Sequence, residues 1–170
     1  MFIDYILICL LVICLYTDIK YKKIYNLVLL PAAVIALTGN LYLNGLEGVL
    51  FSMKGFLLGL GVLIIPFIFG GMGAGDVKLM AVIGAFKGPE FVWLAFLATA
   101  IAGGILSLIV MIKSGQFKLR LRAIWYTLLS IFYIVPRADV IGSIHNSVKY
   151  QTFPYGIAIV TGTAVAYILR

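Results

Sequence analysis

The stretch GGMGAGDVKLM, Gly70–Met80, lies between two hydrophobic runs and carries one acidic residue, Asp76. Glycine weakens a helix interior and adopts backbone conformations that other residues avoid, so the glycine-rich half favours a turn. Hydrophobic residues resume directly after the carboxylate, at Val77. The stretch therefore predicts the end of one apolar helix and the start of another, with Asp76 at the mouth of the second.

The composition of the chain indicates a membrane protein. The chain has 170 residues, of which 64% are hydrophobic, and its mean hydropathy is +1.15. Soluble domains are only about half apolar, and a fold of this length cannot hide so much apolar side chain from water. We therefore exclude an ordinary soluble domain and predict an integral membrane protein with a single domain, 1–170.

The apolar runs predict an all-α fold, a polytopic membrane protein with about six transmembrane helices. The runs are Phe2–Thr17, Ile24–Leu43, Val49–Phe69, Val77–Phe86, Phe91–Ile112 and Pro154–Leu169. Val77–Phe86 is too short to cross a core of about 30 Å, so it either starts deep in the membrane or continues through flanking residues. Residues 123–136, within a cytoplasmic or interfacial segment 113–153, suit an amphipathic helix at the membrane surface; a further crossing is the alternative.

Basic residues define the expected orientation. The formal net charge is +7, and the bases gather between the apolar runs. Cytoplasmic loops of membrane proteins carry an excess of Lys and Arg. Placing 18–26, 70–78 and 113–153 inside puts ten of the thirteen bases there and leaves both termini outside. No motif that reads DNA or RNA is visible, so the charge indicates membrane topology and not nucleic-acid binding.

Two of the six acidic residues, Asp18 and Asp76, fall where a predicted crossing meets the cytoplasmic face. Each alone has a simple explanation: Asp76 as a helix N-cap, and Asp18 as a partner of Lys20 or Lys22. Together they indicate chemistry, because two neighbouring carboxylates do not both ionise easily and share one proton. The ionised group can then activate a water molecule, while the neutral group polarises or protonates an amide.

The residues just before Asp76 fit this hypothesis. Gly73 and Gly75, with Ala74 between them, permit positive φ and a close backbone approach, so an extended peptide can lie against the loop. Close helix packing or a simple turn is the alternative explanation. The GxGD pattern is short, and its weight comes from its place at a helix mouth with a second aspartate on the same face.

Three stretches resemble the type IV prepilin peptidases, a family of GxGD aspartic membrane proteases. GMGAGDVKLMAVIGAF (71–86) is similar to the family's second signature, TDIKYKKIYN (17–26) to its first, and FPYGIAIVTGTAVAY (153–167) to its last helix. The resemblance implies that Asp18 and Asp76 are the catalytic pair and that no metal or organic cofactor is needed. It also implies a prepilin or pilin-like substrate, whose leader is cut at the cytoplasmic face of a bacterial or archaeal plasma membrane.

The chain departs from the family pattern in two ways. The first signature often has Ile-Pro-Asn, whereas this chain has Ile24-Tyr25-Asn26, which leaves Asp18 untouched. Larger members carry an N-terminal cytoplasmic segment with paired cysteines and also methylate the trimmed pilin. This chain begins at its first crossing and so resembles the short, peptidase-only branch that serves Flp or tight-adherence pili, or pilin-like secretion and competence systems. No methyltransferase activity is expected.

Several other residues have structural explanations that we favour. Lys78 follows the positive-inside bias, the alternatives being tuning of the aspartate pair or binding of lipid phosphate. Asn26 caps the second helix, or else contacts substrate. Gly156 and Gly162 are expected to be helix-packing positions, and His145 a surface residue. The two cysteines and the single histidine form no zinc-ligand pattern.

Two other classes of function are open at this point. Intramembrane carboxylates often mark ion paths, so a small proton-coupled transporter or channel component is the main alternative. Transporters commonly have internal repeats, and none is clear in this chain. A noncatalytic membrane scaffold, which uses its glycines for helix contacts, is the third hypothesis.

Overall fold

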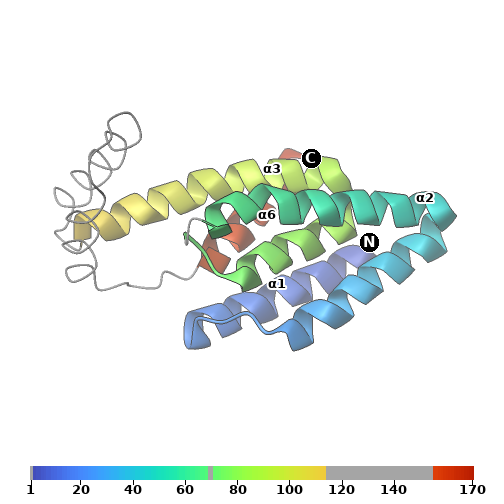
Figure 1. Ribbon diagram of the computed structural model, residues 1–170, viewed down its shortest axis with the longest axis horizontal. Helices are drawn as coiled ribbons and strands as arrows, with labels where there is room; N and C mark the ends of the chain where they lie inside the picture. Colours follow the sequence, from blue (N-terminus) through green and yellow to red (C-terminus); the bar gives the residue numbers. More distant parts are fainter. Residues whose placement is uncertain (1, 69–70, 114–154) are drawn as a thin grey trace, which may run out of the picture. The chain divides into compact units, whose positions relative to one another are not determined.

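The computed structural model describes residues 2–68, 71–113 and 155–170. These residues form the helices α1 (Phe2–Tyr21), α2 (Asn26–Ile68), α3 (Ala74–Lys113) and α6 (Tyr155–Leu169) (Figure 1). The described residues contain no strand, so the all-α prediction is confirmed. The predictions for 123–136, for His145 and for 113–153 beyond its first residue fall outside the described part of the chain.

The two longest helices are each broken once, at a glycine. α2 leaves helical geometry at Gly45 (φ 60°) and α3 at Gly88 (φ 80°), a backbone conformation that glycine adopts at little cost. Asn40 and Ser52, on either side of the first break, are hydrogen-bonded side chain to side chain, so α2 doubles back on itself (Figure 1). The six apolar runs accordingly fall on α1, the two arms of α2, the two arms of α3, and α6.

The length and surface of the helices agree with a membrane protein. α2 and the Ala74–Val110 part of α3 are long and apolar enough to cross a membrane, and α6 is a shorter apolar helix. Large apolar side chains also lie on the outside of the helices, such as Leu27 (85% exposed) and Ile101 (66% exposed). A continuous apolar exterior of this kind is rare in soluble proteins and suits contact with lipid.

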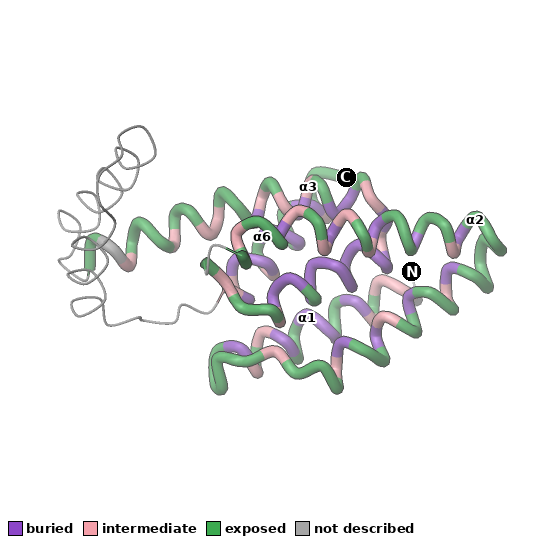
Figure 2. Tube along the Cα trace, in the orientation of Figure 1, coloured by how far each residue is buried: buried purple, intermediate pink, exposed green. Residues whose placement is uncertain are grey.

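The first arm of α3 forms the centre of the packed region. Every residue from Leu79 to Phe86 is buried, on all sides of the helix (Figure 2). The core around it draws on α1, α2 and α6, through residues such as Leu7, Leu63 and Ile159. Asp76 therefore lies in the first turn of a central helix that is enclosed by the rest of the fold.

This central helix also answers the question raised by the short run Val77–Phe86. The helix begins before the run, at Ala74, and continues past it to the break at Gly88. The extension through flanking residues is therefore observed, and the depth at which the helix starts in the membrane stays a prediction.

Small residues bring the second arm of α2 against the central helix. A Cβ added to Gly55 would collide with the backbone of Gly84, and a Cβ added to Gly84 would collide with the backbone of Gly55. Nearby, the buried side chains of Asn40 and Ser52 both donate to the carbonyl oxygen of Ala85. These contacts hold the central helix against both arms of α2 and so fix the position of the loop that leads into it.

The chain divides into two compact units. The first contains Met1–Gly104 and Phe153–Arg170, and thus α1, α2, α6 and most of α3. The second contains Ile105–Thr152, and its described part is the last turns of α3. Every candidate site residue lies in the first unit.

Candidate active site

Both candidate aspartates line one pocket. Asp18 lies in the last turn of α1 and is 6% exposed, and Asp76 lies in the first turn of α3 and is 8% exposed. The pocket has a volume of about 360 Å³ and is bounded by the turn between α1 and α2 and by the loop before α3. Its lining residues are Asp18, Lys22, Lys23, Ile24, Tyr25, Asn26, Gly73, Ala74, Gly75 and Asp76. The structure thus brings together two carboxylates that are far apart in the sequence.

Asp18 is held by backbone groups on both sides. Its Oδ2 accepts a hydrogen bond from the backbone N–H of Gly156, in the first turn of α6, at 2.8 Å. Its own carbonyl accepts the backbone N–H of Lys22 at 2.9 Å, and Lys22 adopts a left-handed conformation (φ 51°). This arrangement is a common way to end a helix, so α1 stops just after the carboxylate and the chain turns across the pocket.

Asp76 is held by the loop that precedes it. Its Oδ2 accepts the backbone N–H of Gly73 at 3.1 Å, and its own backbone N–H donates to the carbonyl of Gly73 at 3.1 Å. The carboxylate therefore reaches back from the third position of α3 to the residue before the helix, as the acidic residue of a capping box does. The explanation of Asp76 as the N-cap itself is wrong, because α3 begins two residues earlier, at Ala74.

Gly73 and Gly75, the glycines of the GxGD stretch, let the backbone of this loop lie close to neighbouring side chains. A Cβ added to Gly75 would lie 2.9 Å from the Cβ of Ile24, and one added to Gly73 would lie 3.3 Å from Oδ2 of Asp76. Neither glycine adopts a positive φ, which among the described glycines occurs at Gly45 and Gly88. The expectation of positive φ at Gly73 and Gly75 is wrong, whereas close backbone approach is observed.

Lys78 and Asn26 contact each other beside the pocket. The Nζ of Lys78 donates to Oδ1 of Asn26 at 2.9 Å, and both residues are exposed. The first-turn amides of Val28 and Leu29 donate to the carbonyl of Tyr25. The side chain of Asn26 therefore ties α2 to α3, where the sequence favoured a cap on α2.

The partners of the two aspartates are neutral. Within the described ranges, neither Asp18 nor Asp76 forms an ion pair, and each accepts a hydrogen bond from a backbone amide. The ion pair considered for Asp18 is not formed by Lys20, whose ammonium group contacts Tyr16 and Tyr21. The described part of the chain also contains no cluster of three or more His, Cys, Asp or Glu residues that could hold a metal ion.

Gly156 has a contact in the site that the sequence did not identify, and the pocket-lining residues Lys22, Lys23, Ile24 and Tyr25 were not predicted either. Gly156 was expected to be a packing position, yet its amide contacts a candidate catalytic carboxylate. Gly162 does behave as a packing position, because an added Cβ would collide with Thr99. The one signal in the sequence was the similarity of 153–167 to the last helix of a known family.

The described residues thus form an all-α fold in which Asp18 and Asp76, at the ends of two helices, line one pocket. Residues 5–108, which include both aspartates, match the model of the type IV leader peptidase family. This match spans more than half of the chain, so the chain belongs to the type IV leader peptidase family. At the level of the family it is thus a GxGD-type aspartic peptidase that acts on a protein substrate. Comparison with curated proteins and with solved structures gives no match.

Proposed function

We propose that this protein is an aspartic endopeptidase that removes the leader of type IV prepilins or pilin-like proteins, with Asp18 and Asp76 as its catalytic pair. The observation that carries the assignment is that two buried carboxylates, at the ends of two different helices, line the same pocket. Membership of the leader peptidase family supports the reaction. The proposal treats 1–170 as one peptidase domain without methyltransferase activity.

The reaction needs one ionised and one protonated carboxyl group. The ionised aspartate takes a proton from a water molecule, and the resulting hydroxide attacks the carbonyl carbon of the scissile peptide bond. The protonated aspartate donates to the carbonyl oxygen, which takes up the proton as the tetrahedral intermediate forms. The proton held by the first aspartate then passes to the leaving nitrogen, the C–N bond breaks, and the second aspartate recovers its proton from the intermediate.

The hydrogen bonds of Asp18 and Asp76 support a proton shared between the two carboxyl groups. One oxygen of each carboxyl group accepts a backbone amide, from Gly156 for Asp18 and from Gly73 for Asp76. An oxygen that accepts an N–H bond is a poor place for a proton, so the second oxygen of each group is available for water, substrate and the shared proton.

The walls of the pocket suit an extended peptide. Gly73, Ala74 and Gly75 have little side chain, so the backbone of a substrate can approach the loop closely. Lys78 and Asn26 form a hydrogen bond between α3 and α2 at the pocket's edge. We infer that the substrate's leader lies in this pocket while its membrane helix stays in the bilayer.

The basic residues near the pocket support a cytoplasmic location for the cut. Lys22 and Lys23 line the pocket, and Lys20 and Lys78 are close to the aspartates in sequence. Under the positive-inside rule this face lies on the cytoplasmic side of a bacterial or archaeal plasma membrane, which the chain crosses several times.

The experiment that tests the proposed function uses purified protein in lipid nanodiscs. A pilin-like leader fused to a membrane helix is the substrate, and the new N-terminus is identified by mass spectrometry. We expect a single cut at the leader boundary, absent with the double variant Asp18→Asn/Asp76→Asn. A substrate that stays intact with folded wild-type protein, together with proton uptake by the same protein in proteoliposomes, would instead support the transporter hypothesis.

A further inference from the structure

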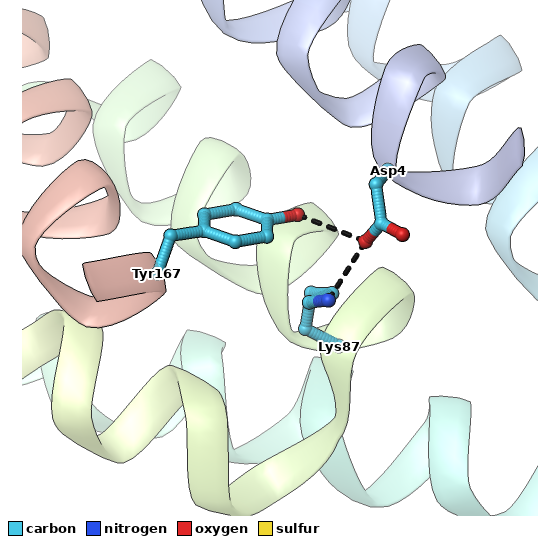
Figure 3. Close-up of polar contacts among 3 residues, drawn as sticks. All are labelled: Asp4, Lys87 and Tyr167. Atoms are coloured by element: carbon cyan, nitrogen blue, oxygen red, sulfur yellow. Dashed lines mark hydrogen bonds and ion pairs between the residues drawn. The ribbon is translucent and has the colours of Figure 1, made fainter. Parts of the chain in front are cut away.

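α6 contacts α1 at two points far apart along both helices. Near the start of α6, the amide of Gly156 donates to Asp18; near its end, the hydroxyl of Tyr167 donates to Asp4 at 3.2 Å (Figure 3). Asp18 ends α1 and Asp4 begins it. The two helices are therefore antiparallel and hydrogen-bonded at both ends.

The contact at the pocket end is so close that a side chain at position 156 would displace the carboxylate of Asp18. Gly156 is buried, and a Cβ added to it would lie 2.5 Å from Oδ2 and 3.0 Å from Cγ of Asp18. Its amide belongs to the first turn of α6, where backbone N–H groups have no partner within the helix. That amide can therefore serve the carboxylate of Asp18 at no cost to α6.

The contact at the other end fixes the position of α6 along α1. Asp4 accepts the Nζ of Lys87 at 2.7 Å as well as the hydroxyl of Tyr167, and the three side chains come from α1, α3 and α6 (Figure 3). The Nζ of Lys87 also lies 4.6 Å from the centre of the Tyr167 ring, which packs edge-on against Phe91. The contacts of Asp4 with Lys87 and Tyr167 form a joint that prevents α6 from sliding along α1. The amide of Gly156 therefore stays at the carboxylate of Asp18.

We propose that Gly156 is a positioning residue for the peptidase reaction, whose backbone amide orients the carboxyl group of Asp18 toward Asp76. The inference rests on the proposed function, because it concerns the geometry of the same pair. The amide occupies one oxygen of Asp18 and thereby turns the other toward the shared proton and the substrate. Gly73 does the same for Asp76 from within the GxGD stretch, so one donor of the pair comes from the last helix, well outside that stretch.

The test removes the amide without adding a side chain. Gly156 is replaced by glycolic acid through nonsense suppression in a cell-free system with nanodiscs, which changes the N–H into an ester oxygen. We expect kcat to fall about tenfold or more, as for the loss of one hydrogen bond to a charged group, with KM unchanged. The melting temperature in detergent should stay close to that of protein in which glycine is restored by the same method.

A second pair of variants separates the contact at Asp18 from general packing of α6. Gly156→Ala places a methyl group against the carboxylate of Asp18. Gly103→Ala, in α3, places a methyl group 3.6 Å from Ala158 of α6, which is an ordinary packing distance. We expect Gly156→Ala to lose at least as much kcat as the ester and Gly103→Ala to cleave like wild type.

The outcomes distinguish this inference from the proposed function. Cleavage by the restored wild type, with unchanged kcat in the ester variant, would overturn the role of Gly156 and leave the peptidase intact. A raised KM or a lowered melting temperature as the main effect of the ester would also overturn it, because a packing role alone predicts those changes. Failure of the wild type to cleave any leader would count against the proposed function itself.

Discussion

The two ends of α1 each hold a carboxylate, and the two carboxylates have opposite kinds of partner. Asp4 accepts hydrogen bonds from the ammonium group of Lys87 and the hydroxyl of Tyr167 (Figure 3). Asp18 lies about 21 Å further along a helix that rises 1.5 Å per residue, and it accepts a backbone amide, that of Gly156. The first group is tied to a cation, and the second lies in a pocket beside another carboxylate.

This difference separates a structural use of a carboxylate from a chemical one. An ammonium group holds a carboxylate in its ionised form, which suits a joint between three helices. A backbone amide orients a carboxyl oxygen without adding a full charge, so Asp18 and Asp76 can still hold one proton between them. We infer that neutral donors are what allow the pair to act as acid and base.

The largest effect is expected when a cation is placed beside the pair. Ile24 lines the pocket and lies against Gly75, so Ile24→Lys would give the aspartates the kind of partner that Asp4 has. We expect the rate of leader cleavage to fall about 100-fold or more, because an ion-paired carboxylate no longer exchanges its proton. The control is Ile24→Met, similar in length and uncharged. Equal cleavage by the lysine and methionine variants would show that the two aspartates do not need neutral partners.

A smaller loss is expected when the GxGD loop is pushed away from the turn between α1 and α2. In Gly75→Ala the new methyl group would lie 2.9 Å from the Cβ of Ile24, so the loop that carries Asp76 must shift. A misplacement of this size should lower the cleavage rate about tenfold to 100-fold. Gly61→Ala is the matched control, because nothing lies within 4 Å of its added Cβ. If both variants cleave like wild type, the loop has more room than the structure indicates.

The contacts between Asp4 and Lys87, at the other end of α1, should contribute to the stability of the fold. A double-mutant cycle with Asp4→Ala and Lys87→Met, followed by unfolding in detergent, should give a coupling free energy of about 1 to 3 kcal/mol. The side chains of Asp4 and Lys87 are 33% and 22% exposed, which favours the lower part of that range. A coupling free energy near zero would mean that this ion pair does not hold the helices together.

The smallest effect is expected at the edge of the pocket. Lys78→Met removes the hydrogen bond to Asn26, but both residues are exposed, and such changes alter stability by about 0.5 kcal/mol or less. The cleavage rate should therefore stay within about threefold of wild type. A tenfold loss would favour the alternative in which Lys78 tunes the aspartate pair.

The features that the sequence predicted are those with a local signal. Runs of apolar residues mark the helices, and the all-α fold follows from them. Asp18 and Asp76 stand out because each interrupts such a pattern at a helix end, and the structure places both in one pocket. The number of crossings and the orientation of the termini stay predictions.

The features that the sequence missed depend on contacts between distant segments. Gly156 and Asp18 are 138 positions apart, so their hydrogen bond exists only once α6 lies along α1. The contact of Asp4 with Lys87 could not be predicted either, because nothing near Asp4 in the sequence reveals a partner 83 positions away. Lys78 and Asn26 were considered one at a time for the same reason, although they contact each other.

The most direct test compares the aspartates at the two ends of α1 in one assay. Asp18→Asn, Asp76→Asn and Asp4→Asn are prepared in nanodiscs, and initial rates of leader cleavage are measured beside melting temperatures. We expect cleavage to fall by at least about 100-fold in the first two variants, which stay folded. Asp4→Asn should cleave within about threefold of wild type, because asparagine keeps the acceptor oxygen that Lys87 and Tyr167 use. Full cleavage by a folded variant at Asp18 or Asp76 would contradict the assignment of the catalytic pair.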